Sequence, residues 1–341
     1  MRGALRNARP LFARRRSEKA TLEPPPQTAE QRPRELAADL LKRLEFNVVR
    51  PLDGFLFGDY SGLFYGPSLD LAEVREYQPG DEVRRIDWYV TARTGTVHVR
   101  QYREEREIRA WLIVDLSASM DFGTRRVLKR ELALEFAGVV ASIISRTGNK
   151  VGAVGFSHGA TKITPLGSGR RQAFTIVQNL LTQGTGHRTA PAPTGSGDEL
   201  TSVLEDANRT MRRRALVFVI SDFISSLDTG QFEREPVWSR ELRRLAFRHD
   251  VITVRITDPA ERELPKVGDL RLRDPETGHE AWIDTSDPRV RRAHAQLVEK
   301  RDRAITRVLR ASRVDQLELS TERDLIEPLL KFTLHRKGRR S

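Results

Sequence analysis

The sequence predicts an α/β protein in which a parallel sheet is covered by helices on both faces and is preceded by a small β-rich module. From residue 110 onward, apolar runs rich in Val and Ile alternate with amphipathic stretches, as in strands buried between two layers of helices. Before residue 107, short strand-like pieces are separated by turns that contain Gly or Pro. With 341 residues, the chain is long enough to bury a full hydrophobic core.

Composition and charge narrow the classes of function. The chain contains no cysteine, which excludes disulfides and sulfur-ligated zinc and fits a cytoplasmic protein. No apolar run reaches the ~20 residues that span a bilayer. The net charge of +12 suggests a nucleic-acid partner, but the first 34 residues carry nine basic and three acidic side chains and the last eleven carry five basic and no acidic ones. The basic excess therefore belongs to the two ends of the chain.

Residues 1–107 divide into a basic segment, a short helix and the β-rich module. Residues 1–34 are polar and contain a Pro run, which predicts a disordered basic segment, although the Arg-rich start also resembles an organelle transit peptide. A short helix, "ELAADLLKRLEF", opens at Glu35 and begins a unit that extends to residue 107. In "QPGD", Pro79 and Gly80 suit the two central positions of a type II turn, which is typical of the β-rich module.

Residues 108–336 form the predicted α/β domain. Its strands are "AWLIVDL", "KVGAVGFS", "RALVFVISDF", "HDVITVRITD" and "VDQLELST". Its helices are expected over 125–146, 169–182, 237–247 and 288–311, with "RDLIEPLLKFTLHR" as the last one. Residues 268–285, around "DPETG", predict an inserted hairpin, and residues 337–341 form a basic tail.

The strand within "AWLIVDLSASMDFG" ends in oxygen-bearing side chains at every second position: Asp115, Ser117 and Ser119. Ligands of open parallel sheets bind beyond the carboxyl ends of the strands, and residues two apart in extended backbone point the same way. A second strand, "VFVISDF", also ends in an acid, Asp222. Because Mg²⁺ prefers oxygen ligands, these residues predict a site for Mg²⁺ or Mn²⁺. Alternatively, they only begin the following helix as capping residues.

Two parts of the chain resemble known families. Asp115, Ser117 and Ser119, followed by Met120, resemble the metal-ion-dependent adhesion site (MIDAS) of the von Willebrand factor A fold, and Asp222 matches the later aspartate of that site. The stretch "EVREYQPGDEVRRIDWYVTARTGTVHVRQYREERE", just before "WLIVDLSASM", resembles the bacterial domain-of-unknown-function family fifty-eight (DUF58). The resemblance covers about residues 48–335. It implies a von Willebrand factor A-like fold, a divalent cation, and work beside a MoxR-type AAA+ ATPase.

One position departs from the family pattern. The usual second loop reads Gly-Thr-Asp-Leu, with the Thr as a ligand, whereas this chain has "TGSGDELTSVL". Aligning on Gly197 and Leu200 places Asp198 where the Thr is expected, with Thr194 nearby as a substitute. Asp198 therefore joins the predicted ligands, and its carboxylate would bind the cation more firmly while cancelling the charge that attracts an acidic partner.

The module before residue 110 carries many charges of alternating sign. They predict either a network that ties the module to the main domain or a surface that docks a partner. Aromatic and Arg side chains are enriched at binding hot spots. The predicted partner-binding residues are Arg84, Arg85, Asp87 and Trp88.

The function predicted from these observations is a non-catalytic, cytoplasmic interaction module whose cation engages a carboxylate of another protein. One alternative is a metal-dependent phosphohydrolase that uses Asp115 and Asp222, but the sequence offers no general acid or base with a clear role. The other alternative is nucleic-acid binding through the basic termini, which should weaken steeply with salt.

Overall fold

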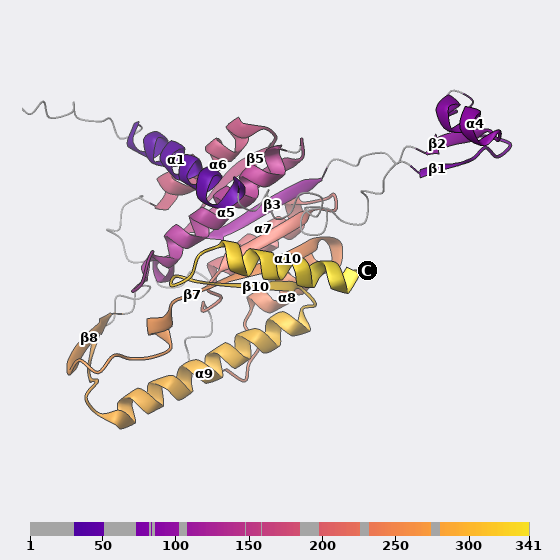
Figure 1. Cartoon of the computed structure of the whole chain (residues 1–341). Helices are drawn as coiled ribbons and strands as arrows, with labels where there is room; N and C mark the ends of the chain where they lie inside the picture. Colours follow the sequence, from indigo (N-terminus) through magenta and orange to yellow (C-terminus); the bar gives the residue numbers. More distant parts are fainter. Residues whose placement is uncertain are drawn as a thin grey trace, which may run out of the picture.

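The centre of the molecule is a six-stranded sheet in the spatial order β10-β7-β6-β3-β4-β5 (Figure 1). The computed structural model describes residues 31–50, 73–81, 83, 86–101, 108–146, 148–157, 159–184, 198–225, 232–273 and 280–340. The strands are β3 (Arg109–Asp115), β4 (Lys150–Ser157), β5 (Ala160–Gly167), β6 (Leu216–Ser221), β7 (Asp250–Thr257) and β10 (Asp315–Ser320). Neighbours pair in parallel except β4 and β5. The predicted fold class is confirmed.

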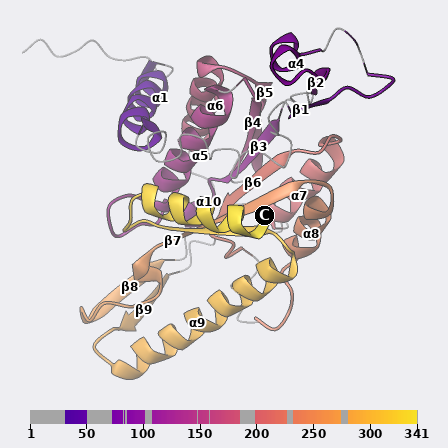
Figure 2. The same cartoon turned by 45° about the vertical axis from the view of Figure 1, so that its right-hand side comes forward.

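Helices cover both faces of the sheet (Figures 1 and 2). One layer consists of α1 (Gln31–Leu44), α5 (Lys129–Arg146), α6 (Arg170–Gly184) and α10 (Ile326–Arg340). The other consists of α7 (Glu199–Thr210), α8 (Trp238–Arg248) and α9 (Pro288–Ala311). Alternate residues of each strand serve the two layers: Phe218 and Ile220 of β6 pack into the first and Val217 and Val219 into the second. Burial on both faces explains the continuous apolar runs in the sequence.

The strand order fixes where a ligand site can form. Numbered along the chain, the sheet strands lie in the order 3-2-1-4-5-6, which is the doubly wound arrangement. The first strand, β3, therefore lies beside the fourth, β6, at the middle of the sheet. The connections leave these two strands toward opposite sides, which opens a crevice beyond their carboxyl ends. Asp115 is the last residue of β3, and Asp222 directly follows β6.

Strand β5 was not predicted from the sequence. It forms the outer edge of the sheet and pairs only with β4. Of its eight residues only Thr164 is buried, so it lacks the apolar run by which the four inner strands are recognised. Pro165 and the exposed Lys162 are residues that edge strands tolerate, because one side of an edge strand has no partner strand.

The module before the sheet contains an antiparallel pair, β1 (Glu73–Glu76) and β2 (His98–Gln101), together with a helix, α4 (Trp88–Thr94). The predicted turn is present, because Asp81 N–H donates to Gln78 O at 3.0 Å and Gly80 has a φ of 110°. The sequence predicted a β-rich module and missed α4. Its start is set by the Asp87 side chain, which accepts from two backbone N–H groups, and its end by Gly95 in the left-handed conformation.

The sequence analysis grouped the first helix with this module, but in the structure the helix packs against the α/β domain. Helix α1 and the π-helical turn η1 (Glu45–Val49) place Leu44 and Val49 in the same buried cluster as the residues of α5. Arg43 also forms a 3.0 Å ion pair with Glu135 of α5. The helix therefore belongs to the α/β domain in its packing, although it precedes the module in sequence.

The predicted inserted hairpin is present as β8 (Asp269–Arg273) and β9 (Glu280–Asp284), beside the start of α9 (Figure 1). Thr285 fixes its base, because the hydroxyl accepts from Val267 N–H at 3.0 Å and donates to Gly268 O at 2.6 Å. Asp287 then caps α9 by accepting from Arg289 N–H. Among all the helices of the described residues, none is long and apolar enough to cross a membrane.

Candidate functional site

The pairing of β3 with β6 brings the first acid of the site into position. Val114 pairs with Ile220, so the residues that follow, Asp115 and Ser221, lie side by side at the carboxyl ends of the two strands. Ser221 Oγ donates to Asp115 Oδ2 at 2.6 Å. Asp115 is therefore anchored from the neighbouring strand through Oδ2, while Oδ1 accepts from the loop that follows β3.

Hydrogen bonds join four predicted residues into one cluster. Asp115 Oδ1 accepts from Ser117 N–H at 2.9 Å. The Oγ atoms of Ser117 and Ser119 lie 3.2 Å apart, and Ser119 Oγ donates to Asp222 Oδ2 at 2.9 Å. The 3₁₀ turn η3 (Ala118–Asp121) begins after Ser117, whose side chain makes no capping hydrogen bond. The two hydroxyls thus face each other and Asp222 instead of capping the turn.

Both aspartates of the cluster are buried, and their charges affect each other. Asp115 is 3% exposed and Asp222 is 2% exposed. Burial and the neighbouring Asp222 carboxylate raise the pKa of Asp115 to about 7. Burial alone would also raise the pKa of Asp222, but the ammonium of Lys129 and three hydrogen bonds outweigh it and hold that pKa below 3.8. Asp115 is therefore the member of the pair whose ionised form is disfavoured by its surroundings.

Lys129, the first residue of α5, is a site residue that the sequence analysis missed. Its side chain is fully buried, and Nζ donates to Asp222 Oδ2 at 2.8 Å and to Glu261 Oε1 at 2.5 Å. Burial alone would lower the pKa of Lys129, but the two carboxylates raise it, so the lysine is charged. One ammonium thus balances part of the negative charge of the cluster.

Glu261 reaches Lys129 from the short turn η4 (Pro259–Glu261), which follows β7. The turn is fixed by a capping box, in which Asp258 accepts from Ala260 N–H and Glu261 accepts from Asp258 N–H. The letters "DPAE" carry this signal in the sequence. No comparable pattern marks Lys129.

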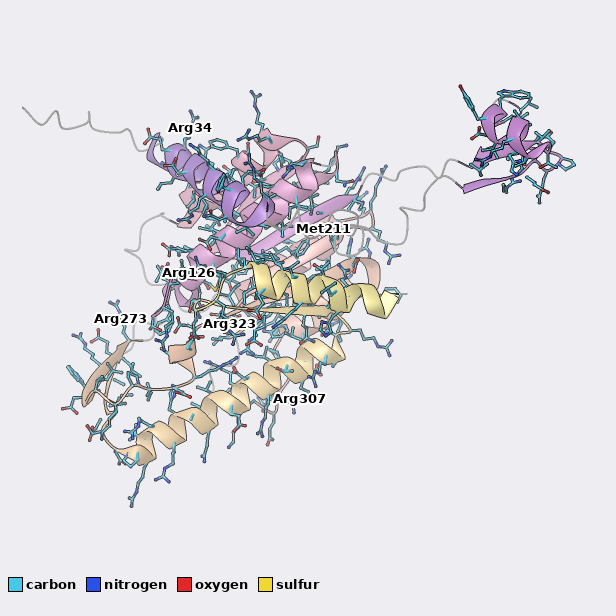
Figure 3. The ribbon with its side chains drawn as sticks, in the orientation of Figure 1. Arg34, Arg126, Met211, Arg273, Arg307 and Arg323 are labelled. Atoms are coloured by element: carbon cyan, nitrogen blue, oxygen red, sulfur yellow. The ribbon has the colours of Figure 1, made fainter. Side chains whose placement is uncertain are left out.

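Asp258 ties the loops around the site together. Its fully buried carboxylate accepts from Thr124 N–H at 2.8 Å, Thr124 Oγ1 at 2.7 Å and Thr321 Oγ1 at 2.5 Å. Burial would raise the pKa of Asp258, but the hydrogen bonds from Thr321 and Thr124 lower it. The loops after β3, β7 and β10 are thereby held together at one edge of the sheet, where Figure 3 labels Arg126 and Arg323.

The other predicted ligand, Asp198, stands immediately before α7. Its Oδ2 accepts from Thr201 Oγ1, one turn into the same helix, at 2.7 Å. Gly197, one of the two residues on which this loop was aligned, and Thr194, the substitute ligand, lie outside the described residues. That Asp198 joins a cation site stays a prediction.

The predicted partner-binding residues have different environments. Trp88 is 68% exposed and the adjacent Tyr89 is 87% exposed, as a docking anchor requires. Asp87 is buried and accepts from Tyr89 N–H and Val90 N–H, so its position is explained by the start of α4. Arg84 and Arg85 lie outside the described residues. Within the module, Arg75 forms a bidentate ion pair with Asp81.

The cluster has the chemistry that a small divalent cation requires. In the part of the chain that the structure describes, no group of three or more His, Cys, Asp or Glu side chains could hold a metal ion, so hydroxyl oxygens would have to complete the ligand set. Ser117 and Ser119 supply such oxygens between two buried carboxylates. A dication beside Asp115 would favour the ionised form that burial and Asp222 disfavour. The residues present therefore fit Mg²⁺ or Mn²⁺.

The doubly wound sheet between two helix layers has the parallel α/β architecture that the resemblance implied. The chain belongs to the family described as protein of unknown function DUF58, which matches residues 73–304. The uncharacterized protein Rv1480 of Mycobacterium tuberculosis is 37% identical over 300 residues, covering 88% of this chain and 90% of the relative. The uncharacterized protein MAV169 of Mycobacterium avium is 30% identical over 173 residues, or 51% of this chain and 93% of the relative.

Solved structures with a similar arrangement share little sequence with the chain. An aerotolerance-related membrane protein from Bacteroides fragilis is 14% identical, with a TM-score of 0.40, and the match covers 68% of this chain and 99% of that one. The protein BatB from Bacteroides thetaiotaomicron is 13% identical, with a TM-score of 0.36 and the same coverage of both chains.

Proposed function

We propose that this protein is a non-catalytic interaction module that binds Mg²⁺ or Mn²⁺ through Asp115, Ser117, Ser119 and Asp222. The cation would be completed by a carboxylate of another protein. The observation that carries this proposal is the hydrogen-bonded cluster of two buried carboxylates and two hydroxyls at the switch point of the sheet. Because Asp222 also pairs with the ammonium of Lys129, a dication there would receive only part of the charge of that carboxylate and could share an acidic side chain of another protein.

The partner in this proposal is a MoxR-type AAA+ ATPase, with the protein acting as a cytoplasmic adaptor in the assembly or remodelling of other complexes. Its support is the family membership, which the resemblance linked to such ATPases. The exposed aromatic pair Trp88 and Tyr89 would add a second contact. A non-catalytic role is supported by Lys129, because its ammonium is bound by two carboxylates and cannot serve as a free acid or base.

The test is binding to the cognate AAA+ ATPase in Mg²⁺ and in EDTA. The wild-type protein should bind in Mg²⁺ and lose at least about tenfold in affinity in EDTA, which corresponds to ~1.4 kcal/mol. Asp115→Ala should bind equally weakly in both buffers, because the ligand that anchors the cation is missing. Surface plasmon resonance with the ATPase immobilised measures both values.

Asp206→Ala is the matched control for this experiment. It removes one aspartate from α7, where the side chain is 70% exposed and pairs only loosely with Arg209, at 3.6 Å. This variant should bind like the wild type. If Asp115→Ala retained Mg²⁺-dependent binding of wild-type strength, the proposed cation-mediated contact would be excluded.

A further inference from the structure

Lys129 occupies a position that helix chemistry disfavours. It is the first residue of α5, and the N-terminal end of a helix carries partial positive charge that favours anions and repels cations. A buried ammonium also needs to be paired if it is to remain charged. Asp222 and Glu261 supply that pairing from two other loops. The site, and not the helix, therefore explains why a lysine stands here.

Lys129 and the candidate metal ligand Ser119 donate to the same carboxylate oxygen of Asp222. Asp222 Oδ2 accepts from Lys129 Nζ at 2.8 Å and from Ser119 Oγ at 2.9 Å. A cation held by the cluster would have to share this carboxylate with the ammonium. Two positive charges at one buried carboxylate repel each other strongly, because the surroundings exclude water. Lys129 should therefore weaken the binding of any metal at the cluster.

The distribution of charge also changes with Lys129. Lys129 and Glu261 carry opposite charges and pair with each other, so together they add no net charge around the cluster. The ammonium nevertheless donates to Asp222 Oδ2 itself and takes up part of the negative charge of that carboxylate. A metal at the cluster would therefore receive less negative charge from Asp222, and a carboxylate from outside can supply it.

We infer that Lys129 is a built-in counter-cation that keeps the metal affinity of the isolated protein low and reserves positive charge for an acidic partner. The inference rests on the proposed function, because it concerns the same cation site. It makes metal retention depend on the partner: the metal is held weakly alone and more firmly once a carboxylate of the partner joins it.

The test is calorimetric titration of Mn²⁺ into the wild type, Lys129→Met and the double variant Lys129→Met/Glu261→Gln. The Met side chain keeps the length of the lysine without its charge, and the Gln substitution removes the acid that would be left unpaired. Both variants should bind Mn²⁺ about tenfold or more tightly than the wild type, a change of ~1.4 kcal/mol. Circular dichroism identifies which variants are folded, and Mn²⁺ affinities are compared only among the folded variants.

Lys162→Met is the matched control, because it removes the same charge from edge strand β5, where Nζ donates to Thr182 Oγ1. Its affinity for Mn²⁺ should equal that of the wild type. An unchanged or weaker affinity in a folded Lys129→Met variant would overturn the inference and leave the proposed function standing. Binding in that variant but not in the wild type would support the inference, because it would identify the lysine as the group that keeps the metal out of the isolated protein. Absence of Mn²⁺ binding in both the wild type and Lys129→Met would overturn the inference and the proposed function together.

Discussion

Mn²⁺ at about one hundred times its dissociation constant should raise the free energy of unfolding of the wild-type protein by ~2.7 kcal/mol. The candidate site exists only in the folded chain, because Asp115 ends β3, the two serines follow it, and Asp222 follows β6. Asp115→Ala should show no such increase, since it removes the carboxylate that the dication would neutralise. Urea unfolding followed by circular dichroism, in Mn²⁺ and in EDTA, measures the difference.

Asp324→Ala serves as the control for this experiment. Asp324 also lies after β10, at the carboxyl edge of the sheet, but its side chain is 82% exposed, and it should leave the stabilisation by Mn²⁺ intact. An equal increase in the wild type and in Asp115→Ala would mean that Mn²⁺ stabilises the protein from another place. The candidate site would then be excluded as its binding site.

Asp258→Asn should lower the free energy of unfolding at pH 7 by about 2–3 kcal/mol, because hydrogen bonds to a charged, buried acceptor contribute more than neutral ones. The amide retains one acceptor oxygen, but its nitrogen is a donor and cannot accept a hydrogen bond. The hydroxyls of Thr124 and Thr321, which donate to different oxygens of Asp258, therefore lose one of their two acceptors. The loops after β3, β7 and β10 would loosen together. Urea unfolding at a series of pH values measures the loss.

The loss should also depend on pH in a defined direction. The folded-state pKa of Asp258 is lowered from its ordinary value of 3.8, so its ionised form contributes stability that is fully present above that value. This contribution disappears as the pH falls through the lowered pKa. The difference between wild type and Asp258→Asn should therefore be constant from pH 5 to 7 and shrink below about pH 3.8. A difference that stayed constant down to the acid transition would contradict this account of Asp258.

Much of the fold could be predicted because buried parallel strands leave a strong mark on the sequence. The four inner strands appear as continuous apolar runs, and the carboxyl ends of two of them carry the acids Asp115 and Asp222. Strand β5 could not be found in this way, because an edge strand with one buried residue shows no apolar pattern. Helix α4 is short and lies among strands, so its start depends on the Asp87 cap and not on periodicity.

The candidate site was predicted in its acids and hydroxyls but not in its balancing charge. Alternating Asp and Ser residues at a strand end are recognisable from spacing alone. Lys129 is separated from Asp222 by 93 positions and from Glu261 by 132, so its role appears only when three loops meet in the folded chain. The neighbouring basic residues of "RRVLKRE" give no sign that this one lysine is buried.

The most direct test of the central claim is a crystal structure of the protein grown with Mn²⁺ and measured for the anomalous scattering of manganese. The account predicts an anomalous peak that contacts Asp115 and the hydroxyls of Ser117 and Ser119, with oxygen ligands around it. A well-ordered site in which the two serines stay hydrogen-bonded to each other, with no peak between them and Asp115, would contradict it.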